Sequence, residues 1–279
     1  NRPLRVGRVS IPKGVFRAPM SGGADGPCRV RAHQAGAGLV VTGMIASGER
    51  VKMRGDTAQR MRRPEITVHM VQLAGRDATA LAEAARIAEG EGADIIDINN
   101  NNDLESFEIS TLKTVSTALG VTYNSEDIDV AFEDLIWANN ITFRDVSSIS
   151  MDNLTAVNAS LGFFNTSVES IVLDNLETVG GTLSITGNSD LAEIDMSSLT
   201  SIGGAFIISN NNDLQSINGF DSLKTVGGAI TFTGDFTNAT LSSLSSVKGG
   251  ATIESTGDLD CSAFNKLSKK GAIQGKGYK

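Results

Sequence analysis

The hydrophobic pattern of the first hundred residues alternates short apolar runs with amphipathic segments. The four apolar runs occupy residues 15–20, 38–44, 67–73 and 93–99. The last two are rich in Val and Ile, as buried parallel strands are. Between them, Asp77 stands at a helix N-cap position, and Ala and Leu recur at helical spacing until Gly92. This alternation predicts βα units, either of a barrel or of a doubly wound sheet.

From about residue 100 the pattern changes to an internal repeat. The clearest copies are VESIVLDNLETVGGTLSITGN (168–188), LAEIDMSSLTSIGGAFIISNN (191–211) and LQSINGFDSLKTVGGAITFTGD (214–235). A degenerate copy covers 239–256, and weaker copies cover 102–124, 128–146 and 147–167. The sequence therefore predicts about seven rungs of 21–24 residues.

Each repeat contains short alternating runs that are separated by Gly-Gly or Asn turns. Such runs are typical of half-buried strands, and Gly and Asn tolerate positive φ at the corners. One rung cannot bury its apolar face alone, so the rungs are expected to stack into a right-handed β-solenoid. Asn124, Asn188 and Asn211 end their rungs. They could form a ladder that binds the turn backbones, or ordinary Asx turns.

The two patterns together predict a mixed fold with two parts. Residues 1–99 form a partial α/β barrel of about four βα strands, and residues 100–279 form the solenoid. Charge divides at the same place. Residues 1–98 hold 15 of the 24 Lys and Arg but only 10 of the 32 Asp and Glu, which gives +5 against −13 for the rest. Charge asymmetry of this size indicates different partners or different origins.

The number of cysteines and the lengths of the apolar runs bear on three features: disulfide frameworks, metal sites and membrane spans. Cys28 and Cys261 are the two cysteines, one in each part, so neither a disulfide framework nor a metal site is expected. No uninterrupted apolar run reaches 18 residues, so no membrane span is expected.

The first part contains the sequence motifs IPKGVFRAPMSG, GAGLVVTGM, VQLAGRD and AEAARIAEGEGADIIDIN. Over residues 3–99 these resemble the N-terminal half of a bacterial tRNA-dihydrouridine synthase, an FMN enzyme built on a TIM barrel. The resemblance implies Pro19, Met20, Ser21 and Gln72 as flavin contacts. Barrel enzymes place their chemistry at the carboxyl ends of strands, where these residues fall.

Departures from that family indicate an inactive fragment with no catalytic residue. The resemblance implies a proton-donor Cys after the fourth strand, but Asn102 occupies that position. An amide has no titratable proton near neutral pH and cannot act as general acid. The later barrel strands and their phosphate loops are absent, and half a barrel leaves open sheet edges. No cofactor is therefore expected, although FMN would be if this half were functional.

The second part carries the repeat LxSIxxxxSLxxVGGxLxIxxN and the closing DLDCSAFNKLSKKGAIQGKGYK. Over residues 100–279 these resemble fungal GPI-anchored cell-wall proteins with receptor-L-domain-like repeats. N-x-S/T sequons occur only in this part, which agrees with a secreted, glycosylated surface. The candidate glycosylation sites are Asn140, Asn153, Asn158, Asn165 and Asn238.

The sequence thus indicates a chimera whose junction lies near residues 99–100. The leading hypothesis is a non-enzymatic cell-surface or cell-wall module, fused to an incomplete flavoenzyme fragment that could cap the solenoid. A cell-wall glycan or protein would be its partner. The alternative is a tRNA-dihydrouridine synthase that reduces uridine in tRNA with FMN and NADPH. The resemblances imply an extracellular or cell-wall location for residues 100–279 and a cytoplasmic one for residues 1–99.

Overall fold

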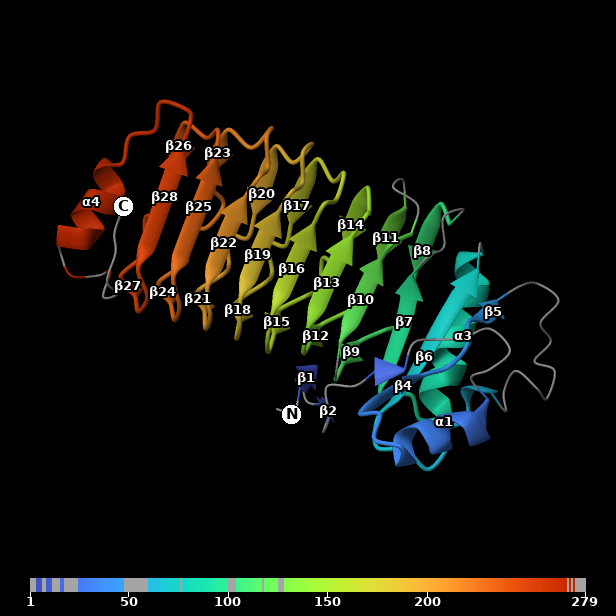
Figure 1. Ribbon diagram of the computed structural model, residues 1–279. Coiled ribbons are helices and arrows are strands. Elements are labelled where there is room, and N and C mark those ends of the chain that lie inside the picture. Colours follow the sequence, from blue (N-terminus) through green and yellow to red (C-terminus); the bar gives the residue numbers. More distant parts are fainter. Residues whose placement is uncertain are drawn as a thin grey trace.

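The structure of the chain is a computed structural model with a long β-coil and a smaller α/β unit at its N-terminal end (Figure 1). It describes residues 4–6, 9–11, 16–17, 25–47, 60–75, 77–99, 104–116, 118–124, 128–269, 271 and 273. Its helices in these residues are α1 (Gly26–Gln34), α3 (Ala78–Gly90) and α4 (Ser262–Lys269).

The N-terminal unit consists of parallel strands that lie side by side in chain order, as in half of a barrel. They are β3 (Phe16–Arg17), β4 (Leu39–Val41), β6 (His69–Gly75) and β7 (Ile95–Asn99), with β5 (Ile45–Ser47) also against β6. A hairpin of β1 (Leu4–Val6) and β2 (Val9–Ile11) adds Ile11 to a small core with Val68 and Ile95. The predicted βα units are confirmed.

Helices α1 and α3 begin where an aspartate caps them. Asp25 accepts a hydrogen bond from the Cys28 backbone N–H at 2.9 Å, and Asp77 accepts one from Ala80 at 2.7 Å. Each carboxylate satisfies an amide that has no partner inside its helix. The predicted helix after Asp77 is therefore α3, while α1 was not predicted.

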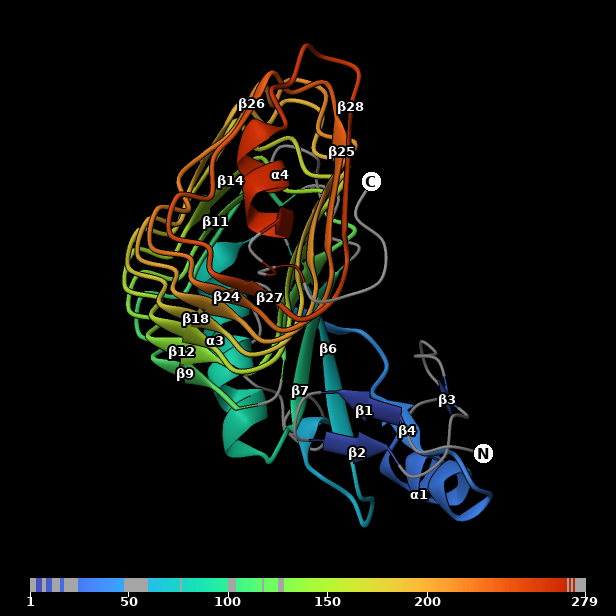
Figure 2. The same ribbon diagram turned by 90° about the vertical axis from the view of Figure 1, so that its left-hand side faces the viewer.

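The predicted β-solenoid is also confirmed, and its coil has three sides (Figure 2). One side is a parallel sheet, here called the main sheet. Its solenoid strands are β10 (Leu119–Thr122), β13 (Ile141–Arg144), β16 (Leu161–Phe164), β19 (Leu183–Thr186), β22 (Phe206–Ser209), β25 (Ile230–Gly234) and β28 (Ala251–Ser255). The second side has β9 (Thr114–Val115), β12 (Trp137–Ala138), β15 (Ala156–Val157), β18 (Thr178–Val179), β21 (Ser201–Ile202), β24 (Thr225–Val226) and β27 (Ser246–Val247).

The third side is divided into shorter sheets. These contain β8 (Ser106–Glu108), β11 (Asp129–Ala131) and β14 (Ser148–Ser150), then β17 (Ser170–Val172) with β20 (Glu193–Asp195), and β23 (Ser216–Ile217) with β26 (Asn238–Ala239). Each rung contributes one strand to successive sides. Its Leu, Ile and Phe side chains then meet those of the rungs before and after it in the centre of the coil.

The main sheet continues without a break from the solenoid into the α/β unit. Strand β7 pairs in parallel with β6 on one edge and with β10 on the other. The α/β strand β7 therefore stands first in the row of strands that continues through β10 to β28, and Figure 1 shows it beside β10. One hydrophobic core runs through both parts, from Leu81 of α3 to Phe264 of α4.

Helices close both ends of this core. Leu81 and Ala88 of α3 are fully buried, in the same cluster as Phe107 of the first solenoid rung. At the other end α4 lies across the coil (Figure 2), where Phe264 packs edge-on against Phe232 with ring centroids 6.4 Å apart. Without such covers, the apolar faces of the terminal rungs would be exposed to water.

Candidate functional site

The face of the main sheet that points away from the core is a candidate binding surface. Alternate residues of a strand point to opposite faces, so Thr186 lies outside where Ile185 lies in the core. In β7, Ile98 is in the core, which places Asp97 on this same outer face. Gln72 is the register partner of Asp97. The barrel-interior face of the α/β unit and the outer face of the solenoid are thus one surface.

Gln72 is the predicted flavin contact that the structure describes. It is buried, its Nε2 donates to Asp97 Oδ2 at 3.1 Å, and its backbone N–H donates to Thr42 Oγ1 at 3.1 Å. These bonds join β6 to β7 and to the residue that follows β4. Pro19, Met20, Ser21 and Asn102 lie outside the described residues, so the predicted site is not assembled from them here.

The helix starts in the described residues are poorly suited to an FMN phosphate. A phosphate is best held by free backbone N–H groups at a helix N-terminus. At α1 and α3 the Asp25 and Asp77 carboxylates each accept a bond from one of these N–H groups, and their negative charge disfavours a second anion. The start of α4 is similar, because Asp260 accepts a bond from the Ser262 backbone N–H at 2.8 Å.

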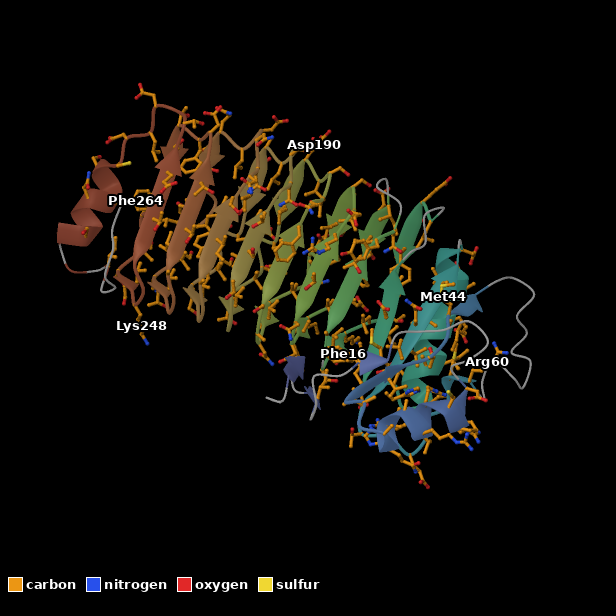
Figure 3. All side chains as sticks on the ribbon, in the orientation of Figure 1. Phe16, Met44, Arg60, Asp190, Lys248 and Phe264 are labelled. Atoms are coloured by element: carbon orange, nitrogen blue, oxygen red, sulfur yellow. The ribbon has the colours of Figure 1, made fainter. Side chains whose placement is uncertain are left out.

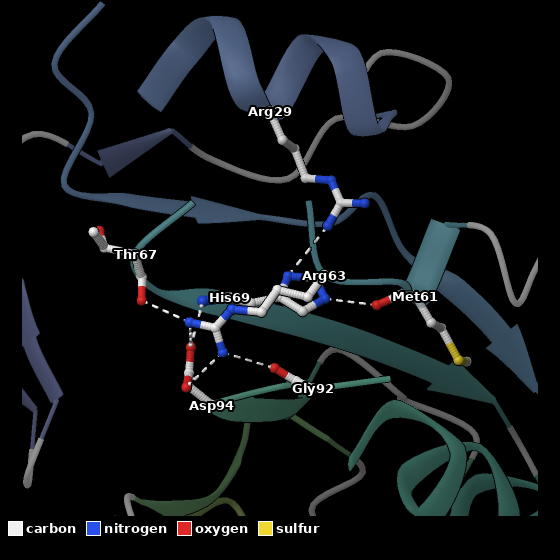
Figure 4. Close-up of polar contacts among 7 residues, drawn as sticks. All are labelled: Arg29, Met61, Arg63, Thr67, His69, Gly92 and Asp94. Atoms are coloured by element: carbon white, nitrogen blue, oxygen red, sulfur yellow. Dashed lines mark hydrogen bonds and ion pairs between the residues drawn. The ribbon is translucent and has the colours of Figure 1, made fainter. Parts of the chain in front are cut away.

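A second polar cluster lies at the amino ends of β6 and β7 (Figure 4). The Arg29 guanidinium is fully buried and lies 3.2 Å from His69 Nδ1. His69 Nε2 lies 2.6 Å from the Met61 carbonyl oxygen. Because a carbonyl only accepts, Nε2 carries the proton and Nδ1 accepts from Arg29. Burial lowers the pKa of His69 most, and the Arg29 and Arg63 charges add to this against the Met61 and Asp94 contributions.

Asp94 and Arg63 complete this cluster on its outer side. Asp94 Oδ2 accepts from the His69 backbone N–H at 2.8 Å and forms an ion pair with Arg63 at 2.9 Å. Arg63 also donates to the Thr67 and Gly92 carbonyls, at 2.7 and 3.1 Å. In barrels this end of the strands serves stability rather than chemistry. The cluster therefore holds residues 60–67 against the sheet.

The sequence analysis missed this cluster. The signal for it was weak, since His69 is a single imidazole at the start of an apolar strand and Arg29 is one basic residue among many. Neither residue is near the other in sequence, and only the βα packing brings them together. In the described residues, no group of three or more His, Cys, Asp or Glu is placed to hold a metal ion.

The outer face of the solenoid carries mainly hydroxyl side chains. One row of register partners crosses this face from β13 to β28. It consists of Arg144, Phe164, Thr186, Ser209, Thr233 and Glu254. Ser209 Oγ donates to Thr186 Oγ1 at 3.2 Å across neighbouring strands. We call this row the outer strip.

Phe164 is the aromatic residue of the outer strip. Its ring lies back over Gly162, where a Cβ added to the glycine would fall 2.3 Å from the ring carbon Cε2. Any other residue at position 162 would therefore push the ring off the sheet. The Arg144 guanidinium carbon lies 4.7 Å from the ring centroid, close enough for a cation–π contact. The sequence does contain a signal, because Phe164 stands where the next three rungs have Thr186, Ser209 and Thr233.

The candidate glycosylation sites lie outside the strands of the main sheet. Asn140 precedes β13 and is half-buried, and Asn165 follows β16 and is exposed. Asn153, Asn158 and Asn238 are also exposed, on other parts of the coil. Modification of these residues stays a prediction. None of the five residues belongs to the outer face of the main-sheet strands, although Asn165 directly follows β16.

Comparisons with known proteins separate the same two parts. The dihydrouridine synthase (Dus) family model matches residues 16–100. A probable tRNA-dihydrouridine synthase of Rhizobium leguminosarum is 52% identical over 91 residues, which is 33% of this chain and 29% of that protein.

Other relatives are fungal proteins, some of them named as cell wall or cell surface proteins. The cell wall mannoprotein PST1 of Saccharomyces cerevisiae is 43% identical over 185 residues, covering 66% of this chain and 41% of that protein. The cell surface GPI-anchored protein ECM33 of Candida albicans is 38% identical over 201 residues, covering 72% and 48%. The two parts of the chain thus resemble two different families. The predicted chimeric resemblance is confirmed.

The matches cover only part of each relative, which limits the properties that can be carried over to this chain. The chain spans 41% of the length of the PST1 relatives, so their properties as whole proteins are not carried over. No solved structure matches the chain. Among the residues that the structure describes, no helix combines the length and apolar character that a membrane crossing needs.

Proposed function

We propose that the chain is a non-enzymatic cell-surface module of the fungal cell-wall type. Its solenoid presents the binding surface, and its Dus-like segment serves as an end cap rather than as a flavoenzyme. The fungal relatives support the first statement, since they are named as cell wall and cell surface proteins. By the same resemblance the solenoid acts outside the cell, bound to a wall glycan or protein.

The strand pairing of β7 supports the second statement, that the Dus-like segment is an end cap and not a flavoenzyme. In a closed barrel the fourth strand must pair with the third and the fifth, because every strand has two neighbours. Here β6 occupies one edge of β7 and solenoid strand β10 occupies the other. A fifth barrel strand has no edge to join. The half-barrel consequently cannot close around a flavin while the solenoid is folded.

The alternative activity, FMN- and NADPH-dependent reduction of uridine in tRNA, is supported by the Dus match over residues 16–100. It needs a cofactor whose phosphate the helix starts in the described residues are poorly suited to hold, as the capped N-termini of α1 and α3 indicate. We therefore propose that the purified chain carries no FMN and binds no tRNA.

One preparation of the full chain can test both statements. It is purified, its absorption near the flavin band is recorded, and it is mixed with isolated yeast cell walls that are then sedimented. We expect no flavin band, and retention of the chain in the wall pellet against a serum albumin control. Stoichiometric flavin together with dihydrouridine formation on added tRNA would overturn the proposal, as would complete recovery in the supernatant.

A further inference from the structure

We propose that the outer strip binds one extended chain of a neutral β-linked glucan, which runs along the solenoid axis. This rests on the proposed function as a cell-wall module, and it specifies the ligand and the surface. The strip runs from the Arg144–Phe164 pair on β13 and β16 to a pocket beside Glu254 on β28. The strands that form it face the viewer in Figures 1 and 3.

Charge identifies the class of ligand. Residues 99–279 carry a net charge of −13, yet the strands β19, β22 and β25 place no charged side chain on the outer face. The row that lies beside the strip on this face consists of Ser184, Ile207 and Thr231. The centre of the strip, between Arg144 and Glu254, therefore carries no charge although the protein is acidic, and it does not attract a cationic or anionic polymer. It suits a neutral polymer whose own surface consists of hydroxyl groups.

The hydroxyl groups of the strip can bond to such a polymer. Each Ser or Thr hydroxyl has one donor and two acceptor positions. Ser209 Oγ donates to Thr186 Oγ1, and Ser184 Oγ shares a second hydrogen bond with the same oxygen at 3.3 Å. One position of Thr186 Oγ1 and two acceptor positions of Ser209 Oγ therefore remain for a ligand. Thr233 continues the row on β25. The Thr186, Ser209 and Thr233 side chains are half-buried, and their rotamers are restricted before any ligand binds.

Spacing favours an extended chain over a single sugar. Parallel strands lie ~4.8 Å apart, so the step from β16 to β28 spans roughly 19 Å. An extended β-linked hexose chain advances by nearly one strand spacing for each sugar. Successive sugars can therefore meet Phe164, Thr186, Ser209 and Thr233 in turn.

Both ends of the strip have features that can hold a sugar. The half-buried Phe164 ring lies against Gly162 and under the Arg144 guanidinium, and its uncovered edge offers apolar contact to the C–H groups of a pyranose. Arg144 adds N–H donors at the same place. At the other end, a pocket of about 560 Å³ is lined by residues that include Glu254, Ser255 and Asp258. Carboxylates accept hydrogen bonds from sugar hydroxyls, so this pocket can receive the end of the chain.

A competing location exists on the second side of the coil. A groove of about 280 Å³ runs there along Thr178, Ser201 and Thr225, with glycines at its floor. It contains no aromatic side chain among its lining residues, and Asn158 lies one rung before Gly180 in the same position. A glycan on the Asn158 sequon would obstruct one end of it. For these reasons the outer strip is the site proposed.

The test measures retention of the full chain on insoluble β-1,3-glucan particles. Thr186→Lys and Thr233→Lys place a long charged side chain in the path of the polymer. We expect each to weaken retention by about tenfold or more, and Phe164→Ala to weaken it less. Thr225→Lys is the matched control in the competing groove, and it should bind as the original chain does. Thermal unfolding of every variant confirms that the fold is retained.

The outcomes separate this inference from the proposed function. If the chain binds isolated walls but not the glucan, the wall module stands and the glucan site is wrong. If it binds glucan but Thr225→Lys alone weakens binding, the groove is the site and the outer strip is wrong. Equal loss in all three lysine variants points to a general charge effect and also overturns the inference.

Discussion

The side chain of Asn124 donates from Nδ2 to the carbonyl oxygen of Ile98, at 3.2 Å. The same bond recurs along the coil, from Asn188 to Phe163 at 3.3 Å and from Asn211 to Ile185 at 3.0 Å. In each case the acceptor belongs to the strand of the preceding rung. Ile98, from the flavoenzyme-like part, therefore occupies the place of a solenoid residue.

The first prediction concerns this bond across the junction. Asn124→Ala removes the donor and leaves a buried carbonyl with one bond fewer, which should lower the free energy of unfolding by about 1–3 kcal/mol. Urea denaturation of the two proteins measures the difference. Asn175→Ala is the control, because its exposed side chain also bonds to a preceding carbonyl, that of Asp152, where water can replace it. Equal effects of the two changes would contradict a special role for Asn124.

Each part of the fold can be predicted from the sequence because apolar residues recur at a characteristic spacing in each part. Alternation of apolar residues identifies the rungs, and βα spacing identifies the half-barrel. The ladder of Asn188 and Asn211 is confirmed as well, since Asn211 Oδ1 accepts from the Asn188 backbone N–H at 2.9 Å. These features are local or repeat at a fixed distance. They can be read without knowing the three-dimensional arrangement.

The shared sheet could also have been read from the sequence. Ile98 precedes Leu104 by the same number of residues as Ile208 precedes Leu214, so β7 follows the solenoid pattern. By contrast, the pairing of Arg29 with His69 depends on two elements far apart in the chain. Such contacts have no period and no short motif, and only the packing of α1 against the sheet creates them.

A second prediction concerns the stacked glycines. A Cβ on Gly203 would lie 2.1 Å from the backbone oxygen of Gly180 in the rung before it. Backbone cannot move aside cheaply, so Gly203→Ala should separate the rungs and cost about 3 kcal/mol or more, at the upper end of overpacking effects. Gly120→Ala is the matched control, since no atom lies within 4 Å of its Cβ. Thermal unfolding should leave the control near the original midpoint.

The third prediction is a loss of stability in mild acid. Burial lowers the pKa of His69 below its ordinary value, and the facing Arg29 and Arg63 charges lower it further. Met61 and Asp94 oppose this without reversing it. In the unfolded chain the imidazole titrates at about 6.5. Below about that pH only the unfolded chain takes up the proton, so stability is retained above it and falls as the pH is lowered.

Urea denaturation at several pH values between 5 and 8 tests this dependence. His69→Gln removes the titrating group and should flatten the profile. An identical slope in the original chain and in His69→Gln would assign the acid sensitivity to other groups.

The fourth prediction concerns α3 as the cover of the solenoid end. Leu81 is fully buried in the core that both parts share. Leu81→Ala should lower the free energy of unfolding by about 2–5 kcal/mol. It should also speed trypsin cleavage, because residues 1–98 contain 15 of the 24 Lys and Arg. Thr79→Ala, at an exposed position of the same helix, should be neutral. If Leu81→Ala released only the N-terminal residues and left the solenoid equally stable, α3 would not be a cap.

The fifth prediction concerns the fit between α3 and the first rung. A pocket of about 130 Å³ remains there, lined by residues that include Ala85, Ile98 and Leu119. Ala85→Leu fills this space with apolar atoms and keeps a good helix former, so it should raise the free energy of unfolding by about 1–2 kcal/mol. The adjacent Ala84 is equally buried but does not line the pocket. Ala84→Leu should therefore overpack the core and destabilise the chain by about 1–3 kcal/mol. Urea denaturation gives both values, and two changes of the same sign would show that the pocket is not a packing defect at the junction.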